Sequence, residues 1–305
     1  MRNRKTIFIL YALLLVHLVS AGNTPLRIVG YFAGQSIPID SFETDKLTHL
    51  IYCFGRLEGN RFSLRNSQDS VIIRRIIERK KTNPELKVML SVGGWSGCPT
   101  CSDVFSTEEN RNAFAASVRQ VSDYFHTDGI DIDWEYPVVK GFPGHKSSLD
   151  DREHFTELLR AIKKHSRDGF EVSFAAGGYN DYIDSAIAWK EIVPLVDFIN
   201  IMSYDLVHGY SVVSGHHTPL YSTALQQQST DNAVKRILEK GVPAEKLVIG
   251  CGFYGRLFRI DSGNAVGLYQ PCSFVHTFPW KHMEDSLSAE KGFARYFDET
   301  AMAPY

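Results

Sequence analysis

The stretch DGIDIDWEYP at residues 128–137 alternates carboxyl-bearing and apolar side chains. Successive side chains of a β-strand point to opposite faces. One face of the expected strand therefore carries three carboxyl groups, from Asp131, Asp133 and Glu135. The other face carries the apolar side chains of Ile130, Ile132 and Trp134. A strand with this pattern predicts an apolar contact with a helical layer on one side and an acidic interior on the other.

Short apolar runs separated by turn residues recur on both sides of that stretch. We expect strands at residues 26–34, 47–54, 87–95, 129–136, 170–178, 196–204 and 246–254. Apolar residues at helical spacing lie between them, at residues 106–125, 149–165 and 230–240. Ser106 with Glu109 predicts a capping box at the start of the first of these helices, and Gly241 predicts the end of the last.

Strands that alternate with helices predict an α/β fold with a parallel sheet. No G-x-G-x-x-G motif follows the first strand, which argues against a dinucleotide-binding sheet. Seven such strands favour a (β/α)8 TIM barrel over an open doubly wound sheet. The sequence offers no eighth strand, so we expect the chain to be a fragment that is truncated before it.

Composition excludes some classes of partner. The 305 residues include 33 basic and 35 acidic side chains, for a formal net charge of -2. This balance gives no electrostatic reason to expect nucleic acid or an anionic membrane as a partner. Hydrophobic residues make up 44% and charged residues 22%, which is typical of a globular protein with a sizeable core.

The first residues differ from the rest. Arg2, Arg4 and Lys5 precede an apolar run at residues 7–19, and small residues follow up to Ala21. This pattern predicts a secretory signal peptide at residues 1–21, with cleavage near Ala21. A retained membrane anchor is the alternative, but the run is shorter than the ~20 residues that a spanning helix needs. We therefore expect a secreted protein, extracellular or periplasmic, with no stable membrane span after cleavage.

The five cysteines are too few for a disulfide scaffold. Cys98 and Cys101 could form a redox pair, half of a zinc site or a loop disulfide. No second cysteine pair and no thioredoxin-like context accompany them, so a loop disulfide is favoured. We expect neither a metal ion nor a cofactor.

Three carboxyl groups on one buried face cannot all remain ionised. Desolvation and mutual repulsion raise the pKa of at least one of them. A carboxylic acid that is protonated at neutral pH is what cleavage of a glycosidic bond requires, and Glu135 would lie at the strand end, where barrel active sites form. A salt-bridged strand is disfavoured because the other strands offer almost no inward basic residues. A divalent metal site remains open on spacing alone.

The stretch at residues 128–137 also resembles the signature of the family 18 glycoside hydrolases, the chitinases. Three further segments agree with that family in the correct order, and the resemblance covers residues 26–256. They are SVGGW at residues 91–95, MSYD at residues 202–205 and YGR at residues 254–256.

The resemblance implies substrate-assisted retaining catalysis. Glu135 would protonate the glycosidic oxygen while the N-acetyl oxygen of the substrate attacks the anomeric carbon. Asp133 would hold the acetamide N–H, Asp131 would share a proton with Asp133, and Tyr204 would orient the acetamide carbonyl oxygen. Asp128 has the opposite parity, so we expect a structural role for it.

The resemblance also implies a groove lined by aromatic rings, which pack well on pyranose C–H groups. The floor and walls would come from Tyr31, Phe54, Trp95 and Tyr136. The minus subsites would be completed by Met202, Asp205, Tyr254 and Arg256. The adjacent residues His216 and His217 are interpreted as loop residues, because neighbours in sequence rarely bind one metal together.

Two departures from the family pattern concern the C-terminal part. No Trp on an eighth strand is present, and residues 257–305 resemble only part of the small α+β insertion that follows the seventh strand. We therefore expect a signal peptide at residues 1–21, a catalytic TIM-barrel domain with strands one to seven at residues 22–256, and a partial α+β insertion at residues 257–305. If the chain ends at Tyr305, we expect exposed sheet edges, poor folding and little activity.

These observations predict a secreted, monomeric glycosidase that cleaves β-1,4-linked N-acetylglucosamine polymers, namely chitin or chitooligosaccharides. One alternative is an endo-β-N-acetylglucosaminidase that acts on N-glycans, and another is a non-catalytic chitinase-like lectin. The presence of Glu135 with Asp131, Asp133 and Tyr204 favours an enzyme over a lectin. An insertion that deepens the groove favours a linear substrate over a branched one.

Overall fold

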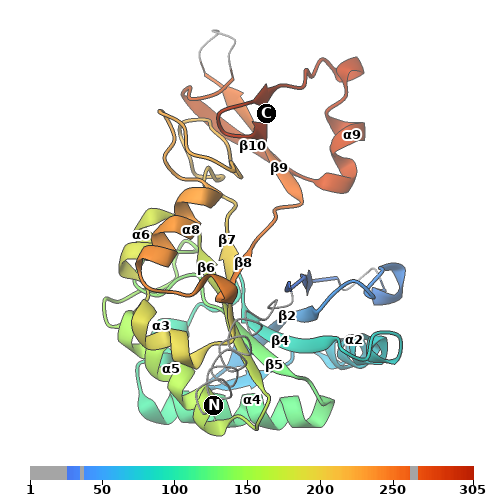
Figure 1. Cartoon of the computed structure of the whole chain (residues 1–305), viewed down its shortest axis with the longest axis vertical. Helices are drawn as coiled ribbons and strands as arrows, with labels where there is room; N and C mark the ends of the chain where they lie inside the picture. The colour runs from blue at the N-terminus through green and yellow to red at the C-terminus, as the bar shows by residue number, and fades with distance from the viewer. Residues whose placement is uncertain (1–25, 35–37, 262–266) are drawn as a thin grey trace, which may run out of the picture.

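One curved parallel sheet forms the body of the molecule in the computed structural model, which describes residues 26–34, 38–261 and 267–305 (Figure 1). Its seven parallel strands follow chain order: β1 (Val29–Phe32), β2 (His49–Glu58), β4 (Lys87–Gly93), β5 (Gly129–Asp133), β6 (Glu171–Gly177), β7 (Phe198–Met202) and β8 (Leu247–Ile249). A short strand, β3 (Arg61–Ser63), pairs antiparallel with β2. The predicted signal peptide at residues 1–21 lies outside the described residues.

The strand order is that of a (β/α)8 barrel through its seventh strand, which confirms the predicted fold class. Within the described ranges no strand joins β1 to β8, so the sheet is curved but open. The same ranges hold no helix long and apolar enough to cross a membrane.

Helices cover the outer face of the sheet (Figure 1). The α-helices of the barrel are α2 (Ser67–Glu78), α3 (Cys101–Phe105), α4 (Glu108–Phe125), α5 (Asp151–His165), α6 (Asn180–Ser185), α7 (Trp189–Ile192) and α8 (Thr230–Glu239). Short 3-10 turns are η1 (Ile39–Ser41), η2 (Arg79–Lys81), η3 (Val193–Leu195) and η4 (Ala244–Lys246). The three helices expected at residues 106–125, 149–165 and 230–240 correspond to α4, α5 and α8.

The predicted alternation along β5 is confirmed. Ile130, Ile132 and Trp134 join the large apolar cluster between the sheet and the helices. A smaller cluster, which includes Met89 and Phe198, occupies the inner side of the sheet. The acidic face of β5 therefore points to the inner side, away from the helices.

The start of α4 differs from the prediction. Its N-cap is Thr107, whose hydroxyl accepts a hydrogen bond from the backbone N–H of Asn110. Ser106 instead ends α3 with helical backbone angles and donates to the carbonyl of Asp103. Because an N-cap needs extended backbone, Ser106 cannot form the capping box expected with Glu109.

The strand predicted at residues 246–254 is also wrong at its end, since β8 stops at Ile249. Gly250 donates its N–H to the carbonyl of Ile201 and so closes the pairing with β7. A side chain on Gly250 would lie 2.4 Å from that carbonyl oxygen, so only glycine allows this approach. Tyr254 belongs to the next strand, which leaves the sheet.

A small lobe follows β8 and stands beyond the end of the sheet (Figure 1). Its main feature is an antiparallel hairpin of β9 (Tyr254–Ile260) and β10 (Cys272–Pro279). The short elements η5 (Trp280–His282), α9 (Met283–Ser286) and η6 (Ala289–Lys291) come next, and β11 (Phe297–Asp298) pairs with β12 (Ala303–Pro304).

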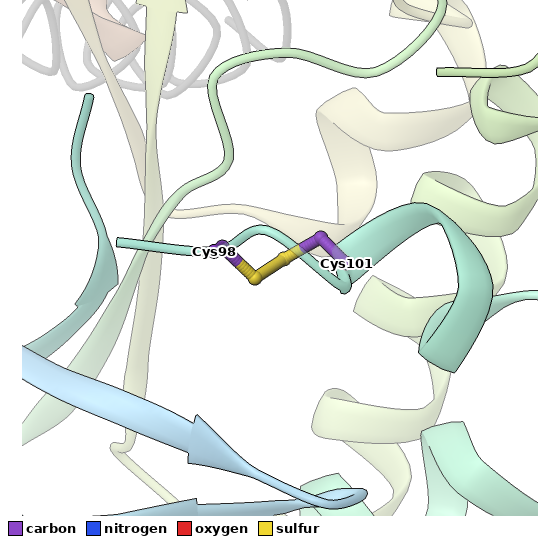
Figure 2. Close-up of a disulfide and its surroundings, with 2 residues drawn as sticks. All are labelled: Cys98 and Cys101. Atoms are coloured by element: carbon purple, nitrogen blue, oxygen red, sulfur yellow. A yellow bond between two sulfur atoms is a disulfide. The ribbon is translucent and has the colours of Figure 1, made fainter. Parts of the chain in front are cut away.

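Cys98 and Cys101 form a disulfide in the loop from β4 to α3, which confirms the loop-disulfide interpretation (Figure 2). Both cysteines are buried. The bond closes the turn that leads from Trp95 into α3.

Candidate active site

Asp131 is fixed at the centre of the inner face of the sheet by four hydrogen-bond donors. One carboxylate oxygen accepts from the Ser173 hydroxyl at 2.6 Å and the Asn200 amide at 3.2 Å. The other accepts from the Ser91 hydroxyl at 2.9 Å and the Tyr31 hydroxyl at 3.1 Å. Burial raises the pKa of Asp131, and these four hydrogen bonds offset only part of the rise.

Asp133 lies two residues further along β5 and is 6% exposed. Burial raises its pKa well above the usual range, and the neighbouring charges of Glu135 and Asp131 raise it further. Its Oδ1 atom is buried and has no hydrogen-bond partner in the structure. Buried polar atoms in folded proteins normally have a hydrogen-bond partner. This oxygen can therefore accept a hydrogen bond from a donor group of a ligand.

Glu135 follows the end of β5, at the carboxyl edge of the sheet. Burial raises the pKa of Glu135 to about 7, with a smaller contribution from the charge of Asp205 and an opposing hydrogen bond from Tyr136. Glu135 therefore exchanges its proton near neutral pH, as a general acid–base group must.

Two glycines let neighbouring loops approach the backbone of this segment. A side chain on Gly93 would lie 1.9 Å from the carbonyl oxygen of Asp133, and one on Gly141 would lie 2.0 Å from that of Glu135. Gly93 also has a φ of 114°, which favours glycine. Glycine at these two positions therefore lets β4 and the loop after β5 pack against the backbone of Asp133 and Glu135.

Asp128, of opposite parity, has the structural role expected for it. Its carboxylate accepts from the backbone N–H of Val88 at 2.7 Å and pairs with Lys80 at 2.6 Å. It lies just before β5 and fixes the register of β5 beside β4.

Tyr204 follows β7 and contributes a hydroxyl on the same inner side. Burial raises its pKa well above the usual value, and the charges of Asp133 and Glu135 raise it further. The hydroxyl therefore keeps its proton and can donate to a ligand. Its ring meets that of Tyr254 edge to face, with centroids 6.1 Å apart.

Asp205 and Arg256 form an ion pair that joins the end of β7 to β9. The Asp205 Oδ1 atom accepts from Arg256 Nε at 2.7 Å and from its terminal nitrogen at 2.6 Å. Burial raises the pKa of Asp205, but hydrogen bonds from neighbouring side chains, among them Tyr254 and Arg256, outweigh it and leave the pKa lowered. Asp205 therefore stays ionised and supplies the negative charge that acts on Glu135.

Aromatic side chains surround these polar groups. Trp95 is 41% exposed, and its ring lies 6.5 Å from that of Tyr136 and 5.9 Å from that of Phe142. Tyr136 also contacts Tyr179 and Tyr182 edge to face. An exposed indole beside the acid offers a flat face of the kind on which a sugar ring packs.

The remaining residues that were predicted to line the groove lie in different parts of the site. Tyr31 lies on the edge strand β1, with its hydroxyl buried against Asp131 and its ring side exposed. Phe54 packs over Gly94, next to Trp95 in the chain, and Met202 is buried at the end of β7. The inner face thus brings together Asp131, Asp133, Glu135 and Tyr204, while Tyr254 and Arg256 approach from the lobe.

Sequence reasoning missed several contributors. Ser91, Ser173 and Asn200 hold Asp131, and their inward parity on expected strands was a usable signal. Phe142 and His217 lie in irregular segments, where no periodicity marks them. His216 proves to be a buried partner of Asp298, with the two side chains 2.9 Å apart. In the portion of the chain that is described, no three His, Cys, Asp or Glu side chains form a group that could hold a metal ion.

Comparison with known proteins identifies the family to which this fold and site belong. Residues 27–305 match the Glycosyl hydrolases family 18. The chain belongs to this family.

Individual proteins that are similar to this chain include several with chitinase or glycosidase names. The chain is 34% identical to chitinase A1 of Niallia circulans over 257 residues, which are 76% of this chain and 37% of that protein. It is 31% identical to chitotriosidase-1 of Mus musculus, over 74% of this chain and 51% of that protein. A solved family 18 N-acetylglucosaminidase from Paenibacillus barengoltzii is 33% identical, with a TM-score of 0.81 over 92% of this chain and 85% of that structure. The chain thus spans between about a third and a half of the length of these two curated relatives.

Proposed function

We propose that this chain carries the catalytic machinery of a retaining glycosidase that cleaves β-1,4-linked N-acetylglucosamine polymers. The observation that carries the proposal is the row of Asp131, Asp133 and Glu135 on the inner face of β5, with the pKa of Glu135 raised to about 7. A carboxyl group of this pKa at the carboxyl edge of a barrel can donate a proton and take it back at neutral pH. The two curated chitinase relatives support the choice of substrate class.

In the proposed reaction Glu135 protonates the glycosidic oxygen as the bond to the anomeric carbon breaks. The acetamide oxygen of the same sugar forms a new bond to that carbon, which gives a cyclic oxazolinium intermediate and needs no enzyme nucleophile. Glu135, now ionised, takes a proton from water, and the water oxygen opens the ring. Two displacements at one carbon retain its configuration.

Asp133 and Tyr204 would hold the acetamide during both steps. The unpartnered Asp133 Oδ1 is suited to accept the acetamide N–H, and the protonated Tyr204 hydroxyl is suited to donate to the acetamide oxygen. Negative charge on Asp133 stabilises the positive intermediate. Asp131, held by four donors, would share a proton with Asp133.

We assign sugar binding to the surrounding side chains. Trp95, Tyr136, Phe54 and Tyr31 supply ring surface or hydroxyl groups beside the acid. The lobe and the end of β7 supply the groups proposed for the minus subsites: Met202, Asp205, Tyr254 and Arg256. The ion pair between Asp205 and Arg256 fixes polar atoms there, and such fixed atoms give a sugar its orientation.

We also propose the division of the chain and its destination from the sequence. Residues 1–21 would direct secretion, the barrel at residues 22–256 would carry the chemistry, and residues 257–305 would belong to an α+β insertion that forms one wall of the groove. The basic residues followed by an apolar run support export. The hairpin of β9 and β10 supports a separate lobe.

Hydrolysis of a soluble chitin oligomer by the full-length protein tests the function. Wild type should release shorter N-acetylglucosamine oligomers from chitotetraose, and Glu135→Gln should lower kcat by a factor on the order of 10³. Glu109→Gln, which changes an exposed Glu in α4, is the matched control and should leave kcat unchanged.

Other outcomes would point to other functions. Wild-type protein that binds the oligomer without cleaving it would be a lectin. Cleavage of a high-mannose glycopeptide in preference to chitotetraose would identify an endo-β-N-acetylglucosaminidase. Equal activity of Glu135→Gln and wild type would remove Glu135 from the reaction.

A further inference from the structure

His217 lies between the end of β7 and the first residue of β9. Its side chain is 13% exposed, and its ring lies 4.9 Å from that of Tyr254. The Nε2 atom is 2.9 Å from the backbone carbonyl oxygen of Tyr254, and the Nδ1 atom is 3.4 Å from the backbone nitrogen of Asp205. The imidazole therefore bridges the barrel and the lobe.

The two partners determine which nitrogen of His217 carries the proton. A carbonyl oxygen can only accept a hydrogen bond, so Nε2 must carry a hydrogen. A backbone N–H can only donate, so Nδ1 must present its lone pair. The neutral Nε2–H tautomer alone satisfies both contacts at once.

Asp205 depends on this contact because its backbone is unusual. Its φ is 57°, in the left-handed region that few residues other than glycine occupy. His217 accepts from the N–H of Asp205, while Arg256 holds the Asp205 carboxylate. The negative charge thus fixed is the one that raises the pKa of Glu135.

The polar groups around His217 and its partner Asp205 come from three segments. Asp205 and Tyr204 follow β7, and the Nδ1 atom lies 3.6 Å from the Asp205 Oδ1 atom. Tyr254 and Arg256 lie on β9. His208, in the loop after β7, interacts with the charges of both Asp205 and Arg256.

We propose that His217 is a positioning residue, a neutral Nε2–H imidazole that holds Asp205 in place beside the general acid and ties β9 to the end of β7. This inference rests on the proposed function, because it gives Asp205 its task through Glu135 and the minus subsites. His217 itself touches neither the acid nor the three carboxyl groups of the inner face.

A pair of variants separates positioning from packing. His217→Asn keeps an acceptor where Nδ1 lies and cannot titrate in the range of activity, whereas His217→Phe keeps the ring and removes both contacts. With chitotetraose and the full-length enzyme, His217→Phe should raise KM by up to about tenfold, the upper range for the loss of one hydrogen bond. His217→Asn should restore the wild-type KM.

The pH profile gives a second readout that a packing role would not change. If Asp205 moves away in His217→Phe, its negative charge no longer raises the pKa of Glu135. The general acid must be protonated, so the alkaline limb of the kcat–pH profile should then move to lower pH in His217→Phe. In His217→Asn this limb should lie at its wild-type position. A His217→Phe variant with the wild-type KM and the wild-type alkaline limb of kcat would overturn the proposal. An equal defect in His217→Phe and His217→Asn would also overturn it.

Nitrogen NMR of wild-type protein without substrate tests the geometry independently of activity and of how the variants fold. At neutral pH the His217 signal, identified by its loss in His217→Asn, should show a bare Nδ1 and a protonated Nε2. An imidazolium or an Nδ1–H tautomer would overturn the proposal. An inactive wild type with the expected tautomer would reject the proposed function alone and would support the contact described here.

Discussion

At the residue scale, the charge of Asp205 and the proton of Glu135 are linked. Asp205 remains ionised because Tyr254 and Arg256 donate hydrogen bonds to its carboxylate, and its charge contributes to the raised pKa of Glu135. An acid that must carry a proton loses activity as the pH rises through its pKa. The charge of Asp205 therefore helps to set the alkaline limit of the proposed reaction.

This link predicts the pH dependence of two proteins. Wild-type kcat should fall on the alkaline side with a midpoint near the pKa of Glu135, which is about 7. Asp205→Asn removes a negative charge, so the pKa of Glu135 should decrease and the midpoint should move to lower pH. Initial rates on chitotetraose between acid and alkaline pH measure both midpoints. A midpoint that moves to higher pH in Asp205→Asn would contradict this electrostatic account.

Residues on β5 were predictable from sequence because their positions depend only on the two-residue period of a strand. The inward Asp131 and Asp133 and the outward Ile130 and Ile132 follow from it. His217 was not predictable, because its role depends on Asp205 and Tyr254, which meet it only through the folding of an irregular loop. A histidine in such a loop gives no periodic signal.

At the element scale, ends of elements were harder to predict than their existence. The run at residues 246–254 has apolar residues on both sides of Gly250 and Gly252, so its hydropathy alone does not separate β8 from β9. The boundary comes from the hydrogen bond between Gly250 and the carbonyl of Ile201, a residue distant in sequence. The start of α4 was missed for a related reason, since Ser106 is the C-cap of α3 and has helical backbone angles.

The cap of α4 can be tested with two neighbouring hydroxyl residues. Thr107→Ala removes the acceptor for the N–H of Asn110 and should lower the free energy of unfolding by about 1 kcal/mol. Ser106→Ala, the matched control, removes only an exposed bond to the Asp103 carbonyl and should change it by less than about 0.5 kcal/mol. Urea unfolding of the three proteins gives both values. A larger loss of unfolding free energy in Ser106→Ala than in Thr107→Ala would instead support the predicted capping box of Ser106 and Glu109.

At the scale of the whole molecule, the acidic interior lowers stability at neutral pH. Asp133 has a folded-state pKa well above that of the unfolded chain, so the folded protein binds the extra proton. Stability from this group is fully present below the unfolded pKa, about 3.9 for Asp, and is lost as the pH rises toward the folded pKa. The interior that suits the proposed chemistry thus weakens the fold where the enzyme would work.

Replacement of Asp133 should therefore separate stability from activity. Asp133→Asn should be more stable than wild type at neutral pH by on the order of 1 kcal/mol or more, and the difference should shrink toward pH 4. It should also lose kcat on chitotetraose by a factor on the order of 10². Asp168→Asn, an exposed carboxylate, is the control for both measurements. Thermal unfolding between acid and neutral pH measures the stability of each protein. The same pH dependence of stability in Asp133→Asn and Asp168→Asn would contradict this account.

The order of the strands has a consequence for how the molecule is made. From β1 to β8, each parallel strand of the sheet pairs with the next along the chain, apart from the small β3 branch. Each such pairing closes only the loop that holds one crossover, so its entropy cost is smaller than that of a pairing between more distant strands. A ribosome releases the chain from its N-terminus, so each strand and covering helix can join a sheet already begun behind it. The acidic strand β5 would pair with β4 before β6 is synthesised, and Asp131 would receive the hydroxyl of Ser173 and the amide of Asn200 only after β6 and β7 have followed.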